Sequence, residues 1–497
     1  MTAAARDLTI RSVRLGPGDG DPAGPVDVHV VGGVITTIAA PTDDRGRGRE
    51  IDGRGMLCMP GFVNAHHHSY DVLAKGLLED MPFDVWALHS QPGYLGPRRA
   101  EELRARTLLS GLECIRSGIT TVQDMCSLVP FDEPCLDAIL GAYAELGIRV
   151  VFSIAVRDVA ALDIRPFLRD VPPDQLAIVE GAAAPAGEQL AFVEAQLARL
   201  PADGLRTWAL SPSGPQRCTT PLLEGLAALS ADHGLPVFTH VYETKAQTAK
   251  AREIYPSDGG SMIAHLDRIG LLTERTSLVH AVWITRSELD QVAAAGSRIV
   301  HNPVSNMKLK SGIAPMVAAR RAGVEVALGC DNCSCGDSHN MFQAMKAYCL
   351  LAAVSTSGPN GLHAGDAVRS ATSVGAAALH LPTVGAVREG MAADLVLYDL
   401  DDLAYQPLND VTRQLVFCES GRGVRTVVVD GRIVLDDGAC TSVDEAALRD
   451  ELVELMPTFR ADVEANRRRA APIERSLLDC LERLRGHDVG LSRILDH

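Results

Sequence analysis

The sequence predicts an α/β protein: a (β/α)8 TIM-type barrel with a small composite β-sandwich built from both chain ends. Eight short β-branched runs alternate with helix-like segments in the middle of the chain, and Gly-rich β segments flank them. Alternating strands and helices imply parallel pairing, and eight such units close a barrel. Several of the runs also end in His or Asp, at the strand ends where barrel enzymes place their chemistry.

Composition narrows the class of protein. The chain has 497 residues, enough for one large core and a smaller domain, and 46% of them are hydrophobic. A formal net charge of −16 argues against a nucleic-acid partner, because DNA and RNA binding need a basic face. No segment approaches a membrane-spanning run, and the first residues lack the apolar core of a signal peptide. Twelve scattered cysteines suggest reduced thiols, so we expect a cytoplasmic protein with neither nucleic-acid nor membrane partners.

Residues 1–60 are expected to form the N-terminal part of the sandwich. Their runs DLTIRSVRL, PVDVHVVGGVITTIAA and EIDGRGML are typical of a β-meander with Gly-rich turns. Residues 383–440 repeat the pattern in GAVREGMAADLVLYDL and VRTVVVDGRIVLDDG. Neither piece is large enough to bury a good core alone, so we expect the two to join beside the barrel.

Residues 61–382 supply the predicted barrel. Its strands, in chain order, are GFVNAHH near 61, TTVQDM near 120, RVVFSIAV near 149, RTWALSP near 206, PVFTHVYE near 236, TSLVHAVWI near 276, SRIVHNP near 297 and EVALGCDN near 325. The stretches between them, such as AEELRARTLLSGLECIRSG, carry apolar residues at helical spacing and end in Gly.

Residues 441–497 are expected to form a C-terminal helical extension. The stretch SVDE offers Ser442 and Glu445 as a capping box, and an amphipathic run follows it. We expect this extension to coat the barrel, with a subunit contact as the alternative, in a protein that forms a homo-oligomer.

Three consecutive histidines, His66, His67 and His68, end the first predicted strand. Side chains at positions i and i+2 of a strand share a face. His66 and His68 should therefore point into the barrel together, while His67 points away and either has a structural role or supports the two histidines from behind.

Later strands add further polar groups at their ends. His240 ends the fifth strand, His280 the sixth and Asp331 the eighth. Three neutral imidazoles and one carboxylate suit Zn²⁺, or alternatively Fe²⁺, with one position open for water. We expect one metal ion per chain at this site, because the fourth strand lacks the Lys that often bridges two metals.

The remaining groups indicate the chemistry. A water on such a metal loses a proton close to neutral pH, and Asp331 can accept that proton. His280 can polarise or orient the substrate atom under attack. Glu243, three residues after His240, can hold a proton and pass it to the leaving group. Because amide ions leave poorly, this donor favours hydrolysis of a C–N bond.

Taken together, these motifs resemble the amidohydrolase superfamily, specifically its aminohydrolase branch of triazine hydrolases, guanine-type deaminases and adenosylhomocysteine deaminases. The resemblance is carried by LCMPGFVNAHHHS, EDMPFDVWA, LECIRSGITTVQDM, THVYET, VHAVWIT, HNPVSNMKLKSGIAPM and VREGMAADLVLYD, and it covers about residues 7–437. It implies the sandwich-plus-barrel fold. It also implies a mononuclear metal site at His66, His68, His240 and Asp331, with Glu243 and His280 as the catalytic partners.

One departure from the branch lies after the fourth strand. Many of its nucleoside-type deaminases have a substrate-binding His where LSPSGPQRC has Ser213, and Gln216 and Arg217 follow instead. These two side chains could pair with a substrate carbonyl or carboxylate, although Arg217 could equally be structural. The difference argues against an adenosylhomocysteine-like substrate.

A second departure is the Cys-rich loop GCDNCSCGDSHNMF around Asp331. Its three thiols are those of Cys330, Cys333 and Cys335. No fourth Cys or His lies at zinc-finger spacing, although His339 is near. We therefore expect small side chains lining a substrate loop rather than a separate metal site, with Ser334 as a candidate substrate contact.

Four further residues are candidate substrate contacts. Trp86 and Gln91, after the first strand, could stack on and hydrogen-bond a flat ring, although Trp86 could equally pack as a lid. His301 and Asn306, after the seventh strand, could contact substrate or shape the loop.

We predict a metal-dependent hydrolase that deaminates a small amino-substituted N-heterocycle of the purine, pyrimidine, pterin or triazine type and releases ammonia. An alternative of the same mechanism expels chloride or an alkylamine, or opens a cyclic amide or urea. A dinuclear amide or phosphotriester hydrolase is disfavoured by the missing Lys. A catalytically silent scaffold would be expected to lose ligands, and none is missing.

Overall fold

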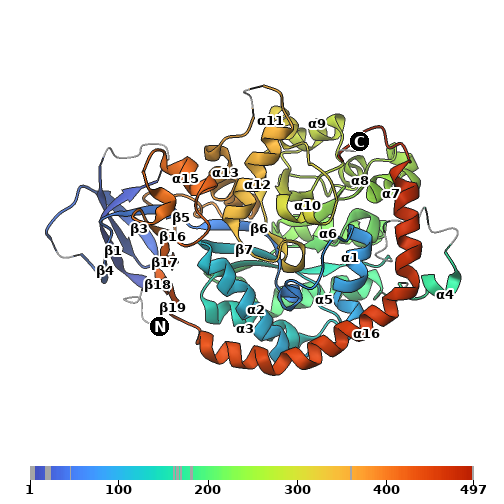
Figure 1. Cartoon of the computed structure of the whole chain (residues 1–497), viewed down its shortest axis with the longest axis horizontal. Coiled ribbons are helices and arrows are strands. Elements are labelled where there is room, and N and C mark those ends of the chain that lie inside the picture. The colour runs from blue at the N-terminus through green and yellow to red at the C-terminus, as the bar shows by residue number, and fades with distance from the viewer. Residues whose placement is uncertain are drawn as a thin grey trace.

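A ring of parallel strands forms the centre of the molecule in the computed structural model (Figure 1). The structure describes residues 6–16, 24–44, 46–159, 163, 167, 171–179, 183–358 and 361–494. The ring consists of β6 (Phe62–His68), β7 (Ile119–Cys126), β8 (Arg149–Val156), β9 (Arg206–Trp208) with β10 (Ser211–Pro212), β11 (Val237–Val241), β12 (Thr276–His280), β13 (Arg298–His301), and β14 (Val326–Leu328) with β15 (Asp331–Asn332).

The fourth and the eighth barrel strands are each divided into two short strands. The pairing of these short strands with both neighbouring strands closes the ring. In the fourth strand, β9 and β10 both pair with β8, and a bridge from Leu210 to Val237 connects that strand to β11. In the eighth strand, β14 pairs with β13, whereas β15 pairs with β6 and sets Asp331 opposite His67. The first and last strands of the predicted barrel are therefore joined where Asp331 pairs with His67.

Apolar side chains fill the inside of the ring and pack against α14 (Ser373–Ala378). They include Val63, Ala65, Met125, Val151, Ala209, Phe238, Val279, Val300 and Ala327. One residue from nearly every strand thus contributes to a packed interior, as expected of a barrel that is filled rather than hollow.

Helices cover the outside of the ring. They include α2 (Ala100–Arg116), α3 (Glu133–Leu146), α5 (Ala186–Arg199), α6 (Thr220–His233), α7 (Lys245–Ile254), α8 (Met262–Arg268), α9 (Arg286–Ala294), α10 (Pro303–Lys308), α11 (Met316–Arg321), α12 (Met341–Val354), α13 (Ala364–Ser370) and α15 (Val411–Phe417). The helices α3 and α6 end at Gly147 (φ 71°) and Gly234 (φ 65°), in the left-handed conformation that glycine adopts without strain. In α2 the C-cap is Ser117, and Gly118 (φ 78°) follows it.

The two chain ends meet in one nine-stranded sheet beside the barrel (Figure 1). Its strands are β1 (Leu8–Leu15), β2 (Val26–Val31), β3 (Val34–Ala39), β4 (Arg49–Asp52), β5 (Met56–Pro60), β16 (Leu395–Asp399), β17 (Val424–Val429), β18 (Arg432–Asp436) and β19 (Ala439–Cys440). Side chains from both ends share one core, in which Ile10 and Val28 lie with Leu395 and Val428.

The N-terminal part is not the simple meander expected from its sequence. β1, β2 and β3 pair antiparallel, but β4 and β5 return parallel to β1. The pairing of β1 with β2 shifts register between Ile10 and Val13. On the other edge of β1, residues 8–11 pair with β4, and Arg14 and Leu15 pair with β5. This places β5 between β1 and β16 and joins the two parts of the sheet.

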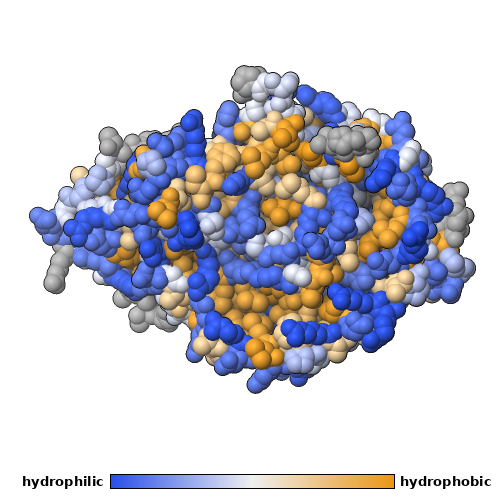
Figure 2. Space-filling model, viewed as in Figure 1, coloured by the Kyte–Doolittle hydropathy of each residue, from blue (hydrophilic) through white to orange (hydrophobic). Residues whose placement is uncertain are grey.

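A long helix follows the last strand of the sheet. This helix, α16 (Glu445–Arg485), has 41 residues and curves around the barrel (Figure 1). Pro457 and Pro472 lie inside it, where each removes a backbone hydrogen bond and permits the bend. Figure 2 shows apolar side chains gathered between α2, α3 and α16, and others over the region of α12, among hydrophilic ones.

The predicted capping box of this helix is wrong. The N-cap is Asp444, whose carboxylate accepts from the backbone N–H groups of Ala446 and Ala447. Ser442 instead donates to the carbonyl of Leu146, because it lies against the end of α3. No helix in the described ranges combines the length and apolarity needed to cross a bilayer.

Candidate active site

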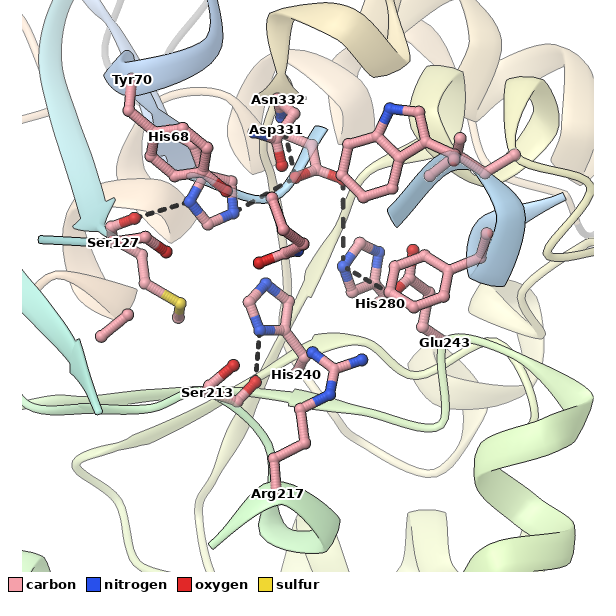
Figure 3. Close-up of a pocket in the computed structure, with 16 residues that line it drawn as sticks. His68, Tyr70, Ser127, Ser213, Arg217, His240, Glu243, His280, Asp331 and Asn332 are labelled. Atoms are coloured by element: carbon pink, nitrogen blue, oxygen red, sulfur yellow. Dashed lines mark hydrogen bonds and ion pairs between the residues drawn. The ribbon is translucent and has the colours of Figure 1, made fainter. Parts of the chain in front are cut away.

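Four side chains that the sequence singled out converge at the C-terminal ends of three barrel strands. His66 and His68 come from β6, His240 from β11 and Asp331 from β15. The Nε2 atoms of His240 and His66 are 3.2 Å apart. Oδ1 of Asp331 lies 3.5 Å from Nε2 of His66 and 3.4 Å from Nε2 of His68. All four residues are buried, and Figure 3 shows His68, His240 and Asp331 around a common centre.

The other ring nitrogen of each histidine is held by an oxygen. Nδ1 of His68 lies 2.6 Å from the carbonyl of Met125, and Nδ1 of His240 lies 2.6 Å from the carbonyl of Ser213. Because a carbonyl can only accept, each Nδ1 carries the proton and each Nε2 directs a lone pair at the centre. Burial lowers the pKa of His68 to about 3, which keeps this ring neutral. Neutral imidazoles whose lone pairs face each other and a carboxylate fit a bound cation.

Asp331 presents its two oxygens differently. Oδ1 faces the histidines, whereas Oδ2 accepts a hydrogen bond from Ser305 Oγ at 2.5 Å. Burial alone would raise the pKa of this carboxyl, but the hydrogen bond to His66 and the nearby imidazoles hold it well below its ordinary value. The backbone of Asp331 has a φ of 62°, a strained conformation for a non-glycine residue.

His280 and Glu243 lie beside this group (Figure 3). Nε2 of His280 is 3.8 Å from Oε2 of Glu243 and 3.9 Å from Oδ2 of Asp331. The Asn306 amide donates to Nδ1 of His280 at 3.0 Å, so the ring proton sits on Nε2 and faces the two carboxyl groups. Burial lowers the pKa of His280 to about 3.

Glu243 is buried in the loop between β11 and α7. Burial, followed by repulsion from Asp331, raises the pKa of its carboxyl well above the ordinary value. The group therefore holds a proton at a pH where Asp331 is ionised. Two carboxyl groups with opposite pKa shifts provide one proton donor and one acceptor.

The cavity next to these groups is small. It has a volume of about 30 Å³ and is lined by His68, Tyr70, Phe83, Trp86, Gln91, Met125, Ser127, Ala155, Ser213, Arg217, His240, Glu243, His280, Leu309, Asp331 and Asn332. A second cavity of about 290 Å³ shares the lining residues Gln91, Ser127, Ala155, Ser213 and Arg217 with it. The larger cavity offers room for the part of a substrate that lies away from His68, His240 and Asp331.

Three of the seven predicted substrate contacts line the small cavity: Trp86, Gln91 and Arg217. Trp86 lies on α1 (Phe83–Ser90), and Gln91 follows its last turn. Arg217 pairs with the buried Asp163, and its guanidinium lies 5.4 Å from the ring centre of Phe83.

The other four predicted contacts are not among the residues that line this cavity. Gln216 is directed at Asp163, at 3.4 Å, and Asn306 holds His280. Ser334 Oγ accepts from the indole N–H of Trp86 at 3.0 Å. His301 is buried at the end of β13, with its ring 5.9 Å from that of Tyr348.

Several residues of the cavity wall are not among those predicted from the sequence. Tyr70 follows His68 by two residues, and Ser127 directly follows β7, so the strand-end rule could have found both. Phe83 and Leu309 enter from α1 and from the residue after α10, and no local pattern marks them.

Comparison with known proteins gives a consistent set of relatives. A sequence profile described as the amidohydrolase family matches residues 57–434. A 5-methylthioadenosine/S-adenosylhomocysteine deaminase of Pelotomaculum thermopropionicum is 31% identical over 404 residues, which cover 81% of this chain and 86% of that protein. A 5'-deoxyadenosine deaminase of Methanothermobacter thermautotrophicus is 32% identical over 399 residues, with 80% and 86% covered.

Solved structures of similar proteins share the fold of this chain. An adenosine deaminase from Xanthomonas campestris with bound zinc superposes with a TM-score of 0.81 at 28% identity, covering 92% of this chain and 99% of that chain. A triazine hydrolase from Arthrobacter aurescens superposes with a TM-score of 0.80 at 25% identity, covering 91% and 100%.

Proposed function

Because this chain belongs to the amidohydrolase family, we propose that it is a metal-dependent hydrolase that deaminates an amino-substituted N-heterocycle and releases ammonia. The observation that carries the proposal is the convergence of Glu243 and His280 beside the Asp331 carboxylate, with His280 Nε2 3.8 and 3.9 Å from the two carboxyl groups. This arrangement places a proton donor, Glu243, near a proton acceptor, Asp331, which is also one of the four candidate ligands.

His66, His68, His240 and Asp331 would hold one ion. Imidazole nitrogens with a single carboxylate are ligands that Zn²⁺ and Fe²⁺ accept, whereas Mg²⁺ and Ca²⁺ prefer oxygen. We propose Zn²⁺, with Fe²⁺ as the alternative; the adenosine deaminase neighbour carries zinc. When bound, the ion supplies the Lewis acid that lowers the pKa of a water molecule.

The protein side chains then manage the protons. Asp331 accepts the proton of the attacking water on Oδ2, the oxygen that is turned away from His66 and His68. His280 donates a hydrogen bond from Nε2 and orients the atom under attack. Glu243 delivers its proton to the leaving nitrogen, which departs as ammonia rather than as an amide ion.

The cavity wall supports a flat, polar substrate. The indole of Trp86 is fixed by its hydrogen bond to Ser334 and can stack on a ring. The Gln91 amide and the Arg217 guanidinium can bind ring nitrogens or an exocyclic oxygen. The relatives named as deaminases of adenosine-type compounds support a purine, with pyrimidine, pterin and triazine rings as further members of the class.

A second candidate keeps the mechanism and changes the leaving group to chloride or an alkylamine. It is supported by the triazine hydrolase that superposes with a TM-score of 0.80. Asp331 as proton acceptor and Glu243 as proton donor would serve in either reaction, so the cavity wall has to discriminate between the substrates.

The test is ammonia release by the zinc-loaded protein against a panel of aminopurines, aminopyrimidines, pterins and triazines, with Asp331→Asn as the blank. We expect ammonia from one ring class and none from the blank. Silence across the panel, with the catalytic ion still bound, would overturn the deaminase and favour dechlorination, dealkylamination or ring opening.

A further inference from the structure

A second group of metal-capable side chains lies on the opposite side of β6 from the candidate active site. His67 points away from the barrel interior, toward Cys114 on α2 and His339 before α12. One potential ligand atom from each of these three residues lies within 4.8 Å of the other two, and all three side chains are buried. A second set with the same spacing joins His339 to Glu113 and Cys333.

Short contacts hold these groups in place. Ser110 Oγ lies 3.2 Å from Nε2 of His67 and 3.2 Å from Nδ1 of His339. The two imidazole rings have centres 4.4 Å apart. Oε2 of Glu113 is 3.9 Å from Sγ of Cys333 and 3.7 Å from Nδ1 of His339.

The buried ring of His67 has one nitrogen left over. Nδ1 of His67 makes no hydrogen bond within the described part of the chain. Nε2 of His339 is also buried and has no hydrogen bond of normal geometry there, although this ring lies beside the backbone of Asp331. Buried polar atoms are nearly always satisfied, and leaving one unpaired costs free energy. One nitrogen held by a hydroxyl and the other left over is also how a metal-binding histidine is arranged.

We propose that His67, Cys114 and His339 bind a second zinc ion outside the barrel. Imidazole nitrogen with thiolate sulfur is a donor set typical of structural zinc. On binding, the S–H bond of Cys114 breaks, its proton goes to solvent and the sulfur bonds to the ion. Cys333 and Glu113 lie at the side of His339 and offer the fourth ligand.

Such an ion would join segments that are far apart in the sequence. His67 lies between the two predicted catalytic ligands of β6 and opposite Asp331 in the strand pairing. Cys114 anchors α2, and His339 anchors the loop that leads into α12. The second ion would therefore brace the strand and the loop that supply the catalytic ligands.

Cobalt substitution separates this site from the catalytic one. A thiolate ligand gives bound Co²⁺ a charge-transfer absorption in the near ultraviolet, and the catalytic ligands include no thiolate. We expect two metal ions per chain by elemental analysis and this absorption after Co²⁺ loading. Cys114→Ser should lose the absorption and one ion, whereas the matched buried variant Cys349→Ser should lose neither.

Two further variants keep the test decisive. His240→Ala should lose the catalytic ion and retain the thiolate absorption, and His67→Ala should do the reverse. If Cys114→Ser fails to fold, His339→Gln replaces it. A single ion per chain without the absorption, or a Cys114→Ser protein with both ions, would overturn the proposal. The ion count and the absorption do not depend on turnover, so the result stands apart from the proposed deaminase activity.

Discussion

Glu243 is the residue whose environment most directly suggests a chemical role. It is buried beside His280 and is not one of the four candidate ligands. We expect Glu243→Gln to lower kcat by roughly 10²- to 10⁴-fold, since the amide cannot supply the proton that a general acid delivers. Metal content should be unchanged. The control is Glu253→Gln, on the exposed side of α7. A Glu243→Gln protein with wild-type kcat would contradict the role.

The raised pKa of Glu243 also predicts a pH dependence. Burial and the nearby Asp331 charge raise this pKa, so the acid keeps its proton to a higher pH than an ordinary glutamic acid does. We therefore expect kcat to fall as the pH rises through the raised pKa, because the donor is then lost. Measuring kcat from acidic to alkaline pH tests this. The same fall in Glu243→Gln would assign it to another group.

For single residues, the sequence predicted which side chains converge. It did not predict which of them line the cavity and which support the lining side chains from behind. The alternation of a strand identified His66 and His68 as a pair, and the structure brings them together with His240 and Asp331. Ser334 and Asn306 lie near the same strand ends, yet they support Trp86 and His280 from behind. Sequence distance from a strand end does not distinguish a cavity wall from the layer that holds it.

The helix α1 shows how one element depends on another. It carries Phe83 and Trp86 to the cavity wall, and it packs on α16. The Asn466 amide of α16 donates to the carbonyl of Leu88 at 2.9 Å and is buried. This contact fixes the end of α1 that lies next to Gln91.

We expect Asn466→Ala to loosen α1, raising KM with little effect on kcat or metal content. The substitution removes the buried hydrogen bond to Leu88 and the two that Oδ1 of Asn466 accepts from Arg469, so it should lower the free energy of unfolding by about 1–3 kcal/mol. Steady-state kinetics and urea unfolding measure the two effects. Glu464→Ala, on the exposed side of the same helix, is the control. A rise in KM of equal size in both variants would contradict a specific role for this contact.

At the element scale, periodicity predicted the eight strands and the long helix, but not where they break. The eighth strand stops at Leu328 because the N–H groups of Gly329 and Cys330 bond to the carbonyls of His301 and His66 on different strands. These are tertiary hydrogen bonds, and no local pattern encodes them. The same limit applies to the second group of ligands. Zinc-finger spacing does not reveal it, because its members come from β6, α2 and the loop before α12.

At the scale of the whole molecule, one buried ion pair joins the barrel to the sheet. Arg149 of β8 makes two hydrogen bonds to the Asp394 carboxylate, at 2.8 and 3.1 Å. Both residues are buried, so removing one partner strands the other charge. We expect Asp394→Ala to lower the free energy of unfolding by about 3–5 kcal/mol. The double variant Arg149→Met with Asp394→Leu should lose less, and thermal unfolding of both compares them. An equal or greater loss in the double variant would contradict the stranded-charge explanation.

The pairing of β15 with β6 has a consequence for how the barrel holds its shape. The strand pairing that closes the ring involves residues of the candidate active site, since Asp331 lies opposite His67 and Asn332 opposite His68 in that pairing. Removing the proposed metal ion should therefore weaken the pairing of β15 with β6 as well as abolish the activity. The Cys330 amide donates to the His66 carbonyl at 3.2 Å and to Oδ1 of Asn64 at 2.9 Å, both on β6, and its hydrogen exchange should become faster in the metal-free protein. If that amide stayed as protected from exchange as the amides inside β12, the pairing of β15 with β6 would not depend on the ion.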